Sequence, residues 1–136
     1  MPNIILTEYC NLQCPYCFAS KMIEDAKDTN CNKNITEEQL LFILDWLRPT
    51  AISQDYCIGL IGGEPTLHPQ FDKILTIVNS FNSLTNSSSI IFTNGLLIDK
   101  FIPRIGESMA LLINVNKLEK SKEEKLIKNL DLLNQL

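Results

Sequence analysis

The chain has 136 residues, 45% of them hydrophobic and 21% charged, which is the composition of an ordinary globular protein with room for one hydrophobic core. Its formal net charge of −4 gives no support for a nucleic-acid or anionic-membrane partner. No apolar run approaches the roughly 20 residues that a membrane-spanning helix needs, and the N-terminus shows no leader pattern. We therefore expect residues 1–136 to form a single cytoplasmic domain.

Three of the five cysteines stand close together near the N-terminus, at Cys10, Cys14 and Cys17, in a C-x-x-x-C-x-x-C pattern. Clustered thiols favour a reducing compartment and metal binding over a secreted disulfide framework. Three thiolates can hold three irons of a cubane cluster and leave the fourth iron open to a small molecule. Taken alone, the spacing also allows a three-thiolate zinc site. Cys57 is expected to be a small buried hydrophobe and Cys31 a loop thiol.

The first half of the chain predicts a strand, a helix and a second strand. Residues 3–7 are a short apolar run that ends where the cysteine pattern begins, so the cysteines follow the carboxyl end of a strand. Thr36 and Gln39 match a capping box that begins a helix, and Pro49 is expected to end it. Residues 56–61 predict the second strand, which stops at a pair of glycines.

The middle of the chain continues this alternation. A helical stripe of apolar residues begins at Phe71. The Ser- and Asn-rich residues 80–89 are expected to form a loop. Residues 90–93 then predict a third strand, and residues 98–105 predict a short helix.

The last part of the chain predicts one more strand and one more helix. The strand covers residues 111–116, and its continuous apolar run indicates burial on both faces. Ser121 with Glu124 predicts the cap of the final helix. The order is therefore a strand followed by a helix, repeated four times, and crossovers of this length join parallel strands. We expect an α/β fold with a parallel sheet.

Reactive groups of parallel α/β folds gather at the carboxyl ends of the strands. Besides the three cysteines, polar or glycine-rich segments follow the other predicted strands. These segments are Gly62-Gly63-Glu64-Pro65, Thr93-Asn94-Gly95, and Asn114 with Asn116. Four segments that are distant in the sequence are thus expected to face one cavity.

The cysteine pattern, C-N-L-Q-C-P-Y-C over residues 10–17, together with Gly62-Gly63-Glu64-Pro65 at a strand end, closely resembles the radical S-adenosylmethionine (SAM) enzyme superfamily. The resemblance implies that the three cysteines hold a [4Fe-4S] cluster whose unique iron is chelated by SAM. It implies an external flavodoxin- or ferredoxin-like electron donor and reductive cleavage of SAM to a 5′-deoxyadenosyl radical. That radical would abstract a hydrogen atom from a substrate that the motifs do not name. General similarity alone suggests a peptide or protein.

The resemblance also assigns residues to the SAM site. Gly62, Gly63 and Glu64 would receive the amino group of the methionine moiety. This fits their chemistry, because a cationic amine needs acceptors and glycine lets a backbone approach closely. Tyr16, the aromatic residue before the last cysteine of the pattern, would lie beside the adenine.

Four further residues are expected at the same site. Asn114 and Asn116 lie two apart on a predicted strand and so share a face, where either of them would contact the ribose hydroxyls. Thr93 and Asn94 would line the same mouth. The plainer alternative is that the asparagines only end a strand. His68, the one histidine, is expected to be a structural or solvent-facing loop residue.

The length of the chain departs from the superfamily pattern. At roughly 31 residues for each β/α unit of a full barrel, the chain has length for about four units, whereas the superfamily core has about six. We therefore expect a partial (β/α) barrel that corresponds to the N-terminal two-thirds of that core. We expect a fragment or truncated form of a longer enzyme. The second choice is a naturally split protein, in which a completing chain or self-association would cover the open fourth strand. The alternative function is a non-catalytic scaffold or partner subunit that holds a cluster or zinc in an incomplete barrel.

Overall fold

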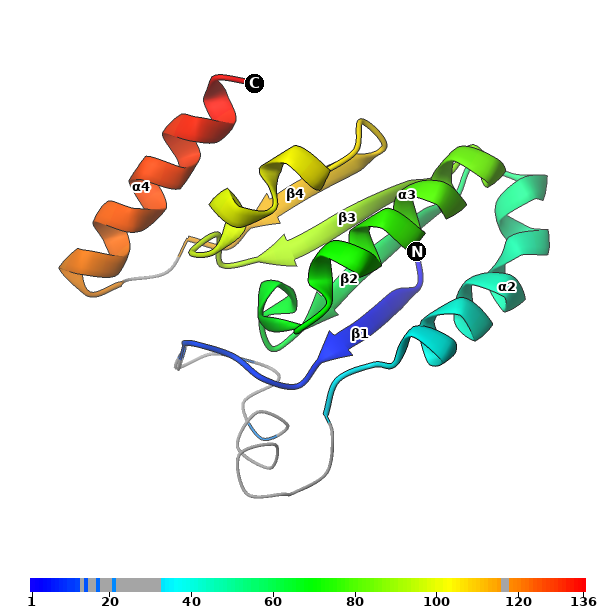
Figure 1. The fold of residues 1–136 in the computed structure, drawn as a ribbon, viewed down its shortest axis with the longest axis horizontal. Helices are drawn as coiled ribbons and strands as arrows, with labels where there is room; N and C mark the ends of the chain where they lie inside the picture. Colours follow the sequence, from blue (N-terminus) through cyan, green and yellow to red (C-terminus); the bar gives the residue numbers. More distant parts are fainter. Residues whose placement is uncertain (13, 15–16, 18–20, 22–32, 116–117) are drawn as a thin grey trace.

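The computed structural model describes residues 1–12, 14, 17, 21, 33–115 and 118–136. A four-stranded sheet with the order β1-β2-β3-β4 forms the centre of the molecule (Figure 1). The strands are β1 (Asn3–Thr7), β2 (Cys57–Gly62), β3 (Ser88–Thr93) and β4 (Met109–Ile113). Every neighbouring pair is parallel, so all four strands end at one edge of the sheet. The predicted α/β fold with a parallel sheet is confirmed.

Helices α2 (Glu37–Ser53) and α3 (Phe71–Thr85) connect the first three strands and lie along one face of the sheet (Figure 1). Between β3 and β4 the chain forms two short 3-10 helices, η2 (Ile98–Lys100) and η3 (Ile102–Arg104). Helix α4 (Lys120–Asn134) follows β4 and lies apart from α2 and α3 (Figure 1). This order corresponds to a partial β/α barrel.

The hydrophobic core lies between the sheet and the helices α2 and α3. Alternate residues of each strand point to this side, and the apolar stripes of the two helices meet them. The buried core residues are Ile4, Leu6, Leu40, Leu44, Leu47, Ala51, Ile58, Leu60, Phe71, Ile74, Leu75, Val78, Phe81, Ile91 and Met109.

The other face of the sheet is more open at its two outer strands. Ile5 of β1 is 49% exposed and Leu112 of β4 is 47% exposed. The expected burial of the fourth strand on both faces is therefore wrong for the described part of the chain. Because the described helices pack on one side, side chains that alternate to the other side stay accessible.

The predicted start of α2 is confirmed, but its predicted end is wrong. Gln39 N–H donates to Thr36 Oγ1 at 3.1 Å, and Thr36 N–H donates to Gln39 Oε1 at 2.9 Å, which completes the capping box. The helix continues past Pro49 to Ser53. Pro49 and Asp45 are both exposed, so the carbonyl of Asp45, four residues before the proline, can be solvated while Leu47 and Ala51 keep the helix packed.

The loop expected over residues 80–89 is also wrong, because α3 extends to Thr85 and β3 begins at Ser88. Buried Asn82 is 1% exposed, and its Nδ2 donates to Ser89 Oγ at 2.9 Å and to Ser108 Oγ at 3.2 Å. Polar side chains that favour loops are thus accommodated in the helix when tertiary partners satisfy them. The helix ends at Asn86, in the left-handed conformation with φ of 53°.

Two predictions about later elements are wrong in detail. Residues 98–105 form two 3-10 turns in place of one helix, because Pro103 lacks an N–H and interrupts a regular helical ladder. Ser121 does not cap the last helix, which begins at Lys120 after Glu119, with no side-chain cap hydrogen bond. Since η2 and η3 are 3-10 turns, the described crossover from β3 to β4 contains no α-helix.

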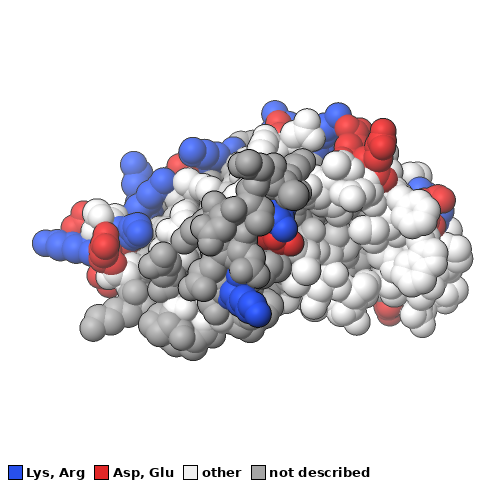
Figure 2. Space-filling view, turned by 90° about the horizontal axis from the view of Figure 1, so that it is seen from below, with Lys and Arg blue, Asp and Glu red and all other residues white. Residues whose placement is uncertain are grey.

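Charged residues are interspersed on the face seen in Figure 2, where Lys and Arg side chains lie among Asp and Glu side chains. Among the helices of the described ranges, none is long and apolar enough to cross a membrane.

Candidate active site

The turn after β2 packs backbone against backbone on the segment that carries the cysteines. We call residues 9–17 the cysteine segment. Gly63 N–H donates to Thr7 O at 2.9 Å, and Glu64 N–H donates to Tyr9 O at 2.7 Å. A Cβ at Gly62 would overlap the carbonyl oxygen of Thr7, and a Cβ at Gly63 would overlap that of Tyr9. Gly62 thus allows the end of β1 to approach the end of β2, and Gly63 allows the start of the cysteine segment to do so.

Glu64 is buried at the centre of this region, with 1% of its surface exposed. Its Oε1 accepts from Thr66 N–H at 3.2 Å, from Thr66 Oγ1 at 2.6 Å and from Thr93 Oγ1 at 2.6 Å. Its Oε2 accepts from Asn94 N–H at 2.8 Å. A carboxylate has about four acceptor positions over its two oxygens. The described contacts crowd Oε1 and leave acceptor capacity on Oε2.

The turn after β3 uses its polar side chains within the protein. Thr93 Oγ1 donates to Glu64 and accepts from Gly95 N–H at 3.1 Å. Asn94 Oδ1 accepts from Leu96 N–H at 3.1 Å, and Asn94 Nδ2 donates to Asn11 Oδ1 at 2.7 Å. Thr93 and Asn94, predicted to line the mouth of the site, therefore connect the end of β3 to Glu64 and to the cysteine segment.

Cys10, Cys14 and Cys17 are partly buried thiols without disulfides. Cys17 N–H donates to Cys14 O at 3.1 Å. Among the described residues, no three side chains of the types Cys, His, Asp and Glu converge so closely that they could hold a metal ion. A cubane cluster takes one thiolate on each iron, so its ligands do not share a single ion.

Local surroundings raise the pKa of two of these thiols. Burial raises the pKa of Cys10 above its ordinary value, a backbone hydrogen bond at Leu12 lowers it in part, and the charge of Glu64 raises it further. Burial and the neighbouring Cys17 raise the pKa of Cys14. Because metals bind thiolates, a metal group that bound these two cysteines would displace their protons.

One cavity of about 510 Å³ collects the segments that follow the strands. Its lining combines soft thiols, a buried carboxylate, amides and apolar side chains, which is a donor set for a sulfur-ligated metal group beside a polar organic molecule. The lining residues are Asn3, Cys10, Leu12, Cys14, Cys17, Ile61, Gly62, Gly63, Glu64, Phe92, Thr93, Asn94, Leu112 and Asn114. The expected convergence at the carboxyl ends of the strands is therefore present.

The remaining predicted site residues lie after β4 or outside the described residues. The strand ends at Ile113, so Asn114 follows it, and Asn114 N–H donates to Thr93 O at 2.9 Å. Asn114 is exposed and lines the cavity. Tyr16 and Asn116 lie outside the described residues, as does Cys31.

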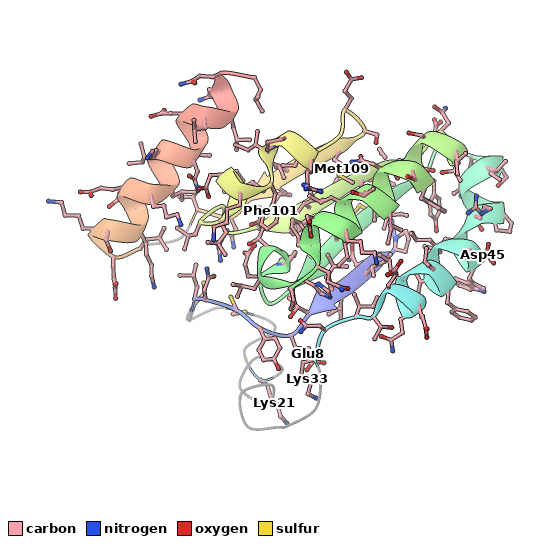
Figure 3. All side chains as sticks on the ribbon, in the orientation of Figure 1. Glu8, Lys21, Lys33, Asp45, Phe101 and Met109 are labelled. Carbon is pink, nitrogen blue, oxygen red and sulfur yellow. The ribbon has the colours of Figure 1, made fainter. Side chains whose placement is uncertain are left out.

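Residues 33–35 are held at the carboxyl end of β1. Ile35 N–H donates to Leu6 O at 2.9 Å, and Lys33 Nζ lies 3.5 Å from Glu8 Oε2, a pair that is labelled in Figure 3.

His68 is 6% exposed, and its Nδ1 accepts from Gln70 N–H at 3.0 Å. Its Nε2 therefore carries the proton and donates to Ile35 O at 2.8 Å. His68 is a structural residue, not a solvent-facing one.

Two residues of this network were not predicted from the sequence. Thr66, two residues after Glu64, donates to its carboxylate through both its backbone N–H and its hydroxyl. The order Glu-Pro-Thr could have indicated this local contact. Asn11 contacts Asn94 across 83 positions of sequence. No local pattern signals that second contact.

The radical SAM superfamily profile matches residues 4–128. The chain belongs to the radical SAM superfamily. Members of this enzyme superfamily use SAM together with an iron–sulfur cluster. The predicted family is therefore confirmed over nearly the whole chain.

Individual radical SAM relatives align with most of this chain but with a small part of their own length. The mitochondrial GTP 3′,8-cyclase of Arabidopsis thaliana is 29% identical over 114 residues, which are 84% of this chain and 27% of that protein. The S-adenosylmethionine-dependent nucleotide dehydratase of Flammeovirga pacifica is 33% identical over 99 residues, 72% of this chain and 31% of that protein. The GTP 3′,8-cyclase of a Synechocystis strain is 29% identical, and the match covers 32% of it. The chain thus spans about a third or less of these relatives.

Proposed function

We propose that this chain forms the cofactor-binding part of a radical SAM enzyme. In this proposal Cys10, Cys14 and Cys17 hold a [4Fe-4S] cluster, and SAM occupies the cavity beside it. When bound, the cluster and SAM together supply a 5′-deoxyadenosyl radical that abstracts a hydrogen atom from a substrate. The observation that carries the proposal is the single cavity shared by the three thiols and by the segments that follow β2, β3 and β4.

The protein contributes binding and orientation. Glu64 is held at its Oε1 by Thr66 and Thr93, and its Oε2 retains capacity for a cationic amine. This favours the proposed contact with the amino group of SAM. The apolar lining residues Ile61, Phe92 and Leu112 offer a hydrophobic wall to the apolar parts of a bound organic molecule.

The assignments around the nucleoside part of SAM stay proposals. Tyr16 would lie beside the adenine, and Asn114 or Asn116 would contact the ribose. Support for Asn114 comes from its exposed position on the cavity wall after β4. A flavodoxin- or ferredoxin-like protein would donate the electron.

The relatives favour a nucleotide over a peptide as the substrate. Two of them are named for GTP cyclisation and one for nucleotide dehydration, whereas none of these names supports a peptide. We therefore propose a nucleotide-type substrate for the protein to which this cofactor site belongs.

The non-catalytic alternative rests on the open end of the sheet. In the described part of the chain, β4 pairs with β3 alone, and a free strand edge favours pairing with another chain. A completing chain or a second copy at this edge stays a prediction. A scaffold would bind a cluster or zinc without forming 5′-deoxyadenosine from SAM.

The test begins with cysteine variants of the anaerobically purified chain, reconstituted with iron and sulfide. Cys14→Ala is expected to abolish the cluster because one iron loses its thiolate. Cys57→Ala is the matched control, since this partly buried thiol lies at the start of β2 and is absent from the cavity lining. Iron, acid-labile sulfide and zinc are measured per chain. Equal cluster loss in both variants, or zinc without sulfide, contradicts the ligand assignment.

The same preparation separates catalysis from scaffolding. With dithionite and SAM, the proposed enzyme site forms 5′-deoxyadenosine, which chromatography detects, and Cys14→Ala forms none. If this chain binds a cluster and SAM but yields no 5′-deoxyadenosine while a longer form that contains it does, the result points to truncation. Failure of both forms supports the scaffold.

A further inference from the structure

Asn94 is placed between the two halves of the site. It is 7% exposed and follows directly after β3. Its backbone N–H donates to Glu64 Oε2 at 2.8 Å, while its side-chain Nδ2 donates to Asn11 Oδ1 at 2.7 Å. One residue thus contacts both the buried carboxylate and the cysteine segment.

The orientation of the Asn94 amide is determined by the backbone. Leu96 N–H can only donate, and it donates to Oδ1 of Asn94 at 3.1 Å. Nδ2 must therefore be the atom that faces Asn11, and Asn11 must present its Oδ1. Asparagine combines the acceptor and the donor that this position requires, whereas aspartate offers acceptors alone.

The turn that carries Asn94 is itself held by α4. Asn129, 2% exposed, donates through Nδ2 to Gly95 O at 2.8 Å and to Leu96 O at 3.2 Å. Gly95 has a positive φ of 77°, and a Cβ there would lie 2.7 Å from Leu126 Cδ1. Contacts from α4 therefore restrict the turn in addition to those of Glu64 and Asn11.

We propose that Asn94 is a positioning residue that sets the place of Cys10 relative to Glu64. Cys10 stands between two tethers. On one side Tyr9 O accepts from Glu64 N–H at 2.7 Å, and on the other Asn11 binds Asn94, whose backbone binds the Glu64 carboxylate. The inference deepens the proposed function, because it explains how the first cluster ligand is held beside the carboxylate proposed to bind SAM.

This role differs from the cofactor contact predicted for Asn94 from the sequence. An amide committed to Asn11 and Leu96 keeps one Nδ2 hydrogen, so its main described partners are protein groups. Losing the tether should loosen Cys10 more than Cys14 or Cys17, which lie further along the segment. Such a selective effect separates positioning from general stability.

The experiment measures thiol alkylation in the folded, metal-free chain with iodoacetamide, resolved for each cysteine by mass spectrometry. Asn11→Ala removes the acceptor and is expected to raise the alkylation rate of Cys10 about threefold to tenfold, the effect of one lost hydrogen bond. Asn11→Asp keeps an acceptor, and its charge beside Cys10 raises the pKa of that thiol, so a Cys10 rate at or below the wild-type rate is expected. Asn94→Ser, which is too short to reach Asn11, should act like Asn11→Ala. Cys57 is the internal reference.

Asn79→Ala is the matched control, because Asn79 Nδ2 donates to Arg104 O at 3.0 Å and neither residue lines the cavity. An unchanged Cys10 rate in Asn11→Ala overturns the proposal, as does an equal rise at Cys10 and Cys57. If Asn94→Ser does not fold, Asn11→Ala and Asn11→Asp decide the question alone. Because alkylation needs no cluster, the result stands apart from the test of cluster binding.

A second readout uses the reconstituted protein. In Asn11→Ala the electron paramagnetic resonance signal of the reduced cluster is expected to shift or broaden, and Asn11→Asp should return it toward the wild-type signal. A signal that stays unchanged in Asn11→Ala, together with unchanged alkylation, refutes the positioning role while leaving the cluster assignment intact. Failure to form any cluster in the wild-type chain refutes the proposed function instead.

Discussion

Replacing Gly63 by alanine is expected to lower the free energy of unfolding by about 3 kcal/mol, a cost of overpacking with a weakened backbone hydrogen bond. The new Cβ would overlap the carbonyl oxygen of Tyr9 and lie 2.6 Å from its carbonyl carbon. Backbone atoms cannot rotate away as a side chain can, so the cysteine segment must move off β2. That movement stretches the bond from Glu64 N–H to Tyr9 O and displaces Cys10.

Urea denaturation of the metal-free chain measures this change, and iron per chain after reconstitution measures the displacement of the cysteine. Gly59→Ala, within β2, is the matched control. Its Cβ would overlap Oδ1 of Asn3 and lie 3.3 Å from Cε2 of Phe92. Both are side-chain atoms, and the Asn3 side chain is exposed and can rotate, so a change within about 1 kcal/mol is expected. Wild-type stability and full iron loading in Gly63→Ala would contradict the described packing.

Glu64→Gln is expected to lower the free energy of unfolding by about 2 kcal/mol, the cost of an unpaired buried polar group. The glutamine oxygen can replace Oε1, which accepts from Thr66 and Thr93. Its NH₂ group then faces Asn94 N–H, so two donors meet where Oε2 accepts at 2.8 Å. The same change removes the negative charge proposed to bind the amino group of SAM.

Two measurements distinguish the effect on stability from the effect on SAM binding. Urea denaturation reports stability, and calorimetric titration with SAM on the cluster-loaded chain reports binding, which we expect to weaken at least tenfold, the effect of about 1.4 kcal/mol. Glu107→Gln, an exposed glutamate, is the charge-matched control and should change neither quantity. Loss of stability with unchanged SAM affinity would make Glu64 a purely structural residue.

The elements with strong local signals were predicted well. Thr36 and Gln39 form the capping box that their spacing indicates, because both hydrogen bonds close within one turn of chain. The apolar stripe that begins at Phe71 is buried as its period requires. Residues 3–7 form a strand with the predicted bounds.

The errors occur where tertiary contacts override a local preference. Asn82 lies in a helix and not in a loop because Ser89 and Ser108 satisfy its side chain. Helix α2 passes through Pro49 because buried residues on both sides of the proline hold it against the sheet. Local composition indicates which structure each short segment prefers, but packing energy is contributed by segments elsewhere.

The chemical groups of the site and the alternation of strands and helices follow from residue type and spacing alone. A parallel sheet then brings the cysteine pattern and Gly62-Gly63-Glu64 to one edge. Which of these polar groups hydrogen-bond to one another within the protein depends on tertiary packing. Thr93 binds Glu64 across 29 positions and Asn94 binds Asn11 across 83, and such partners are set by how the strands pack, which no local pattern contains.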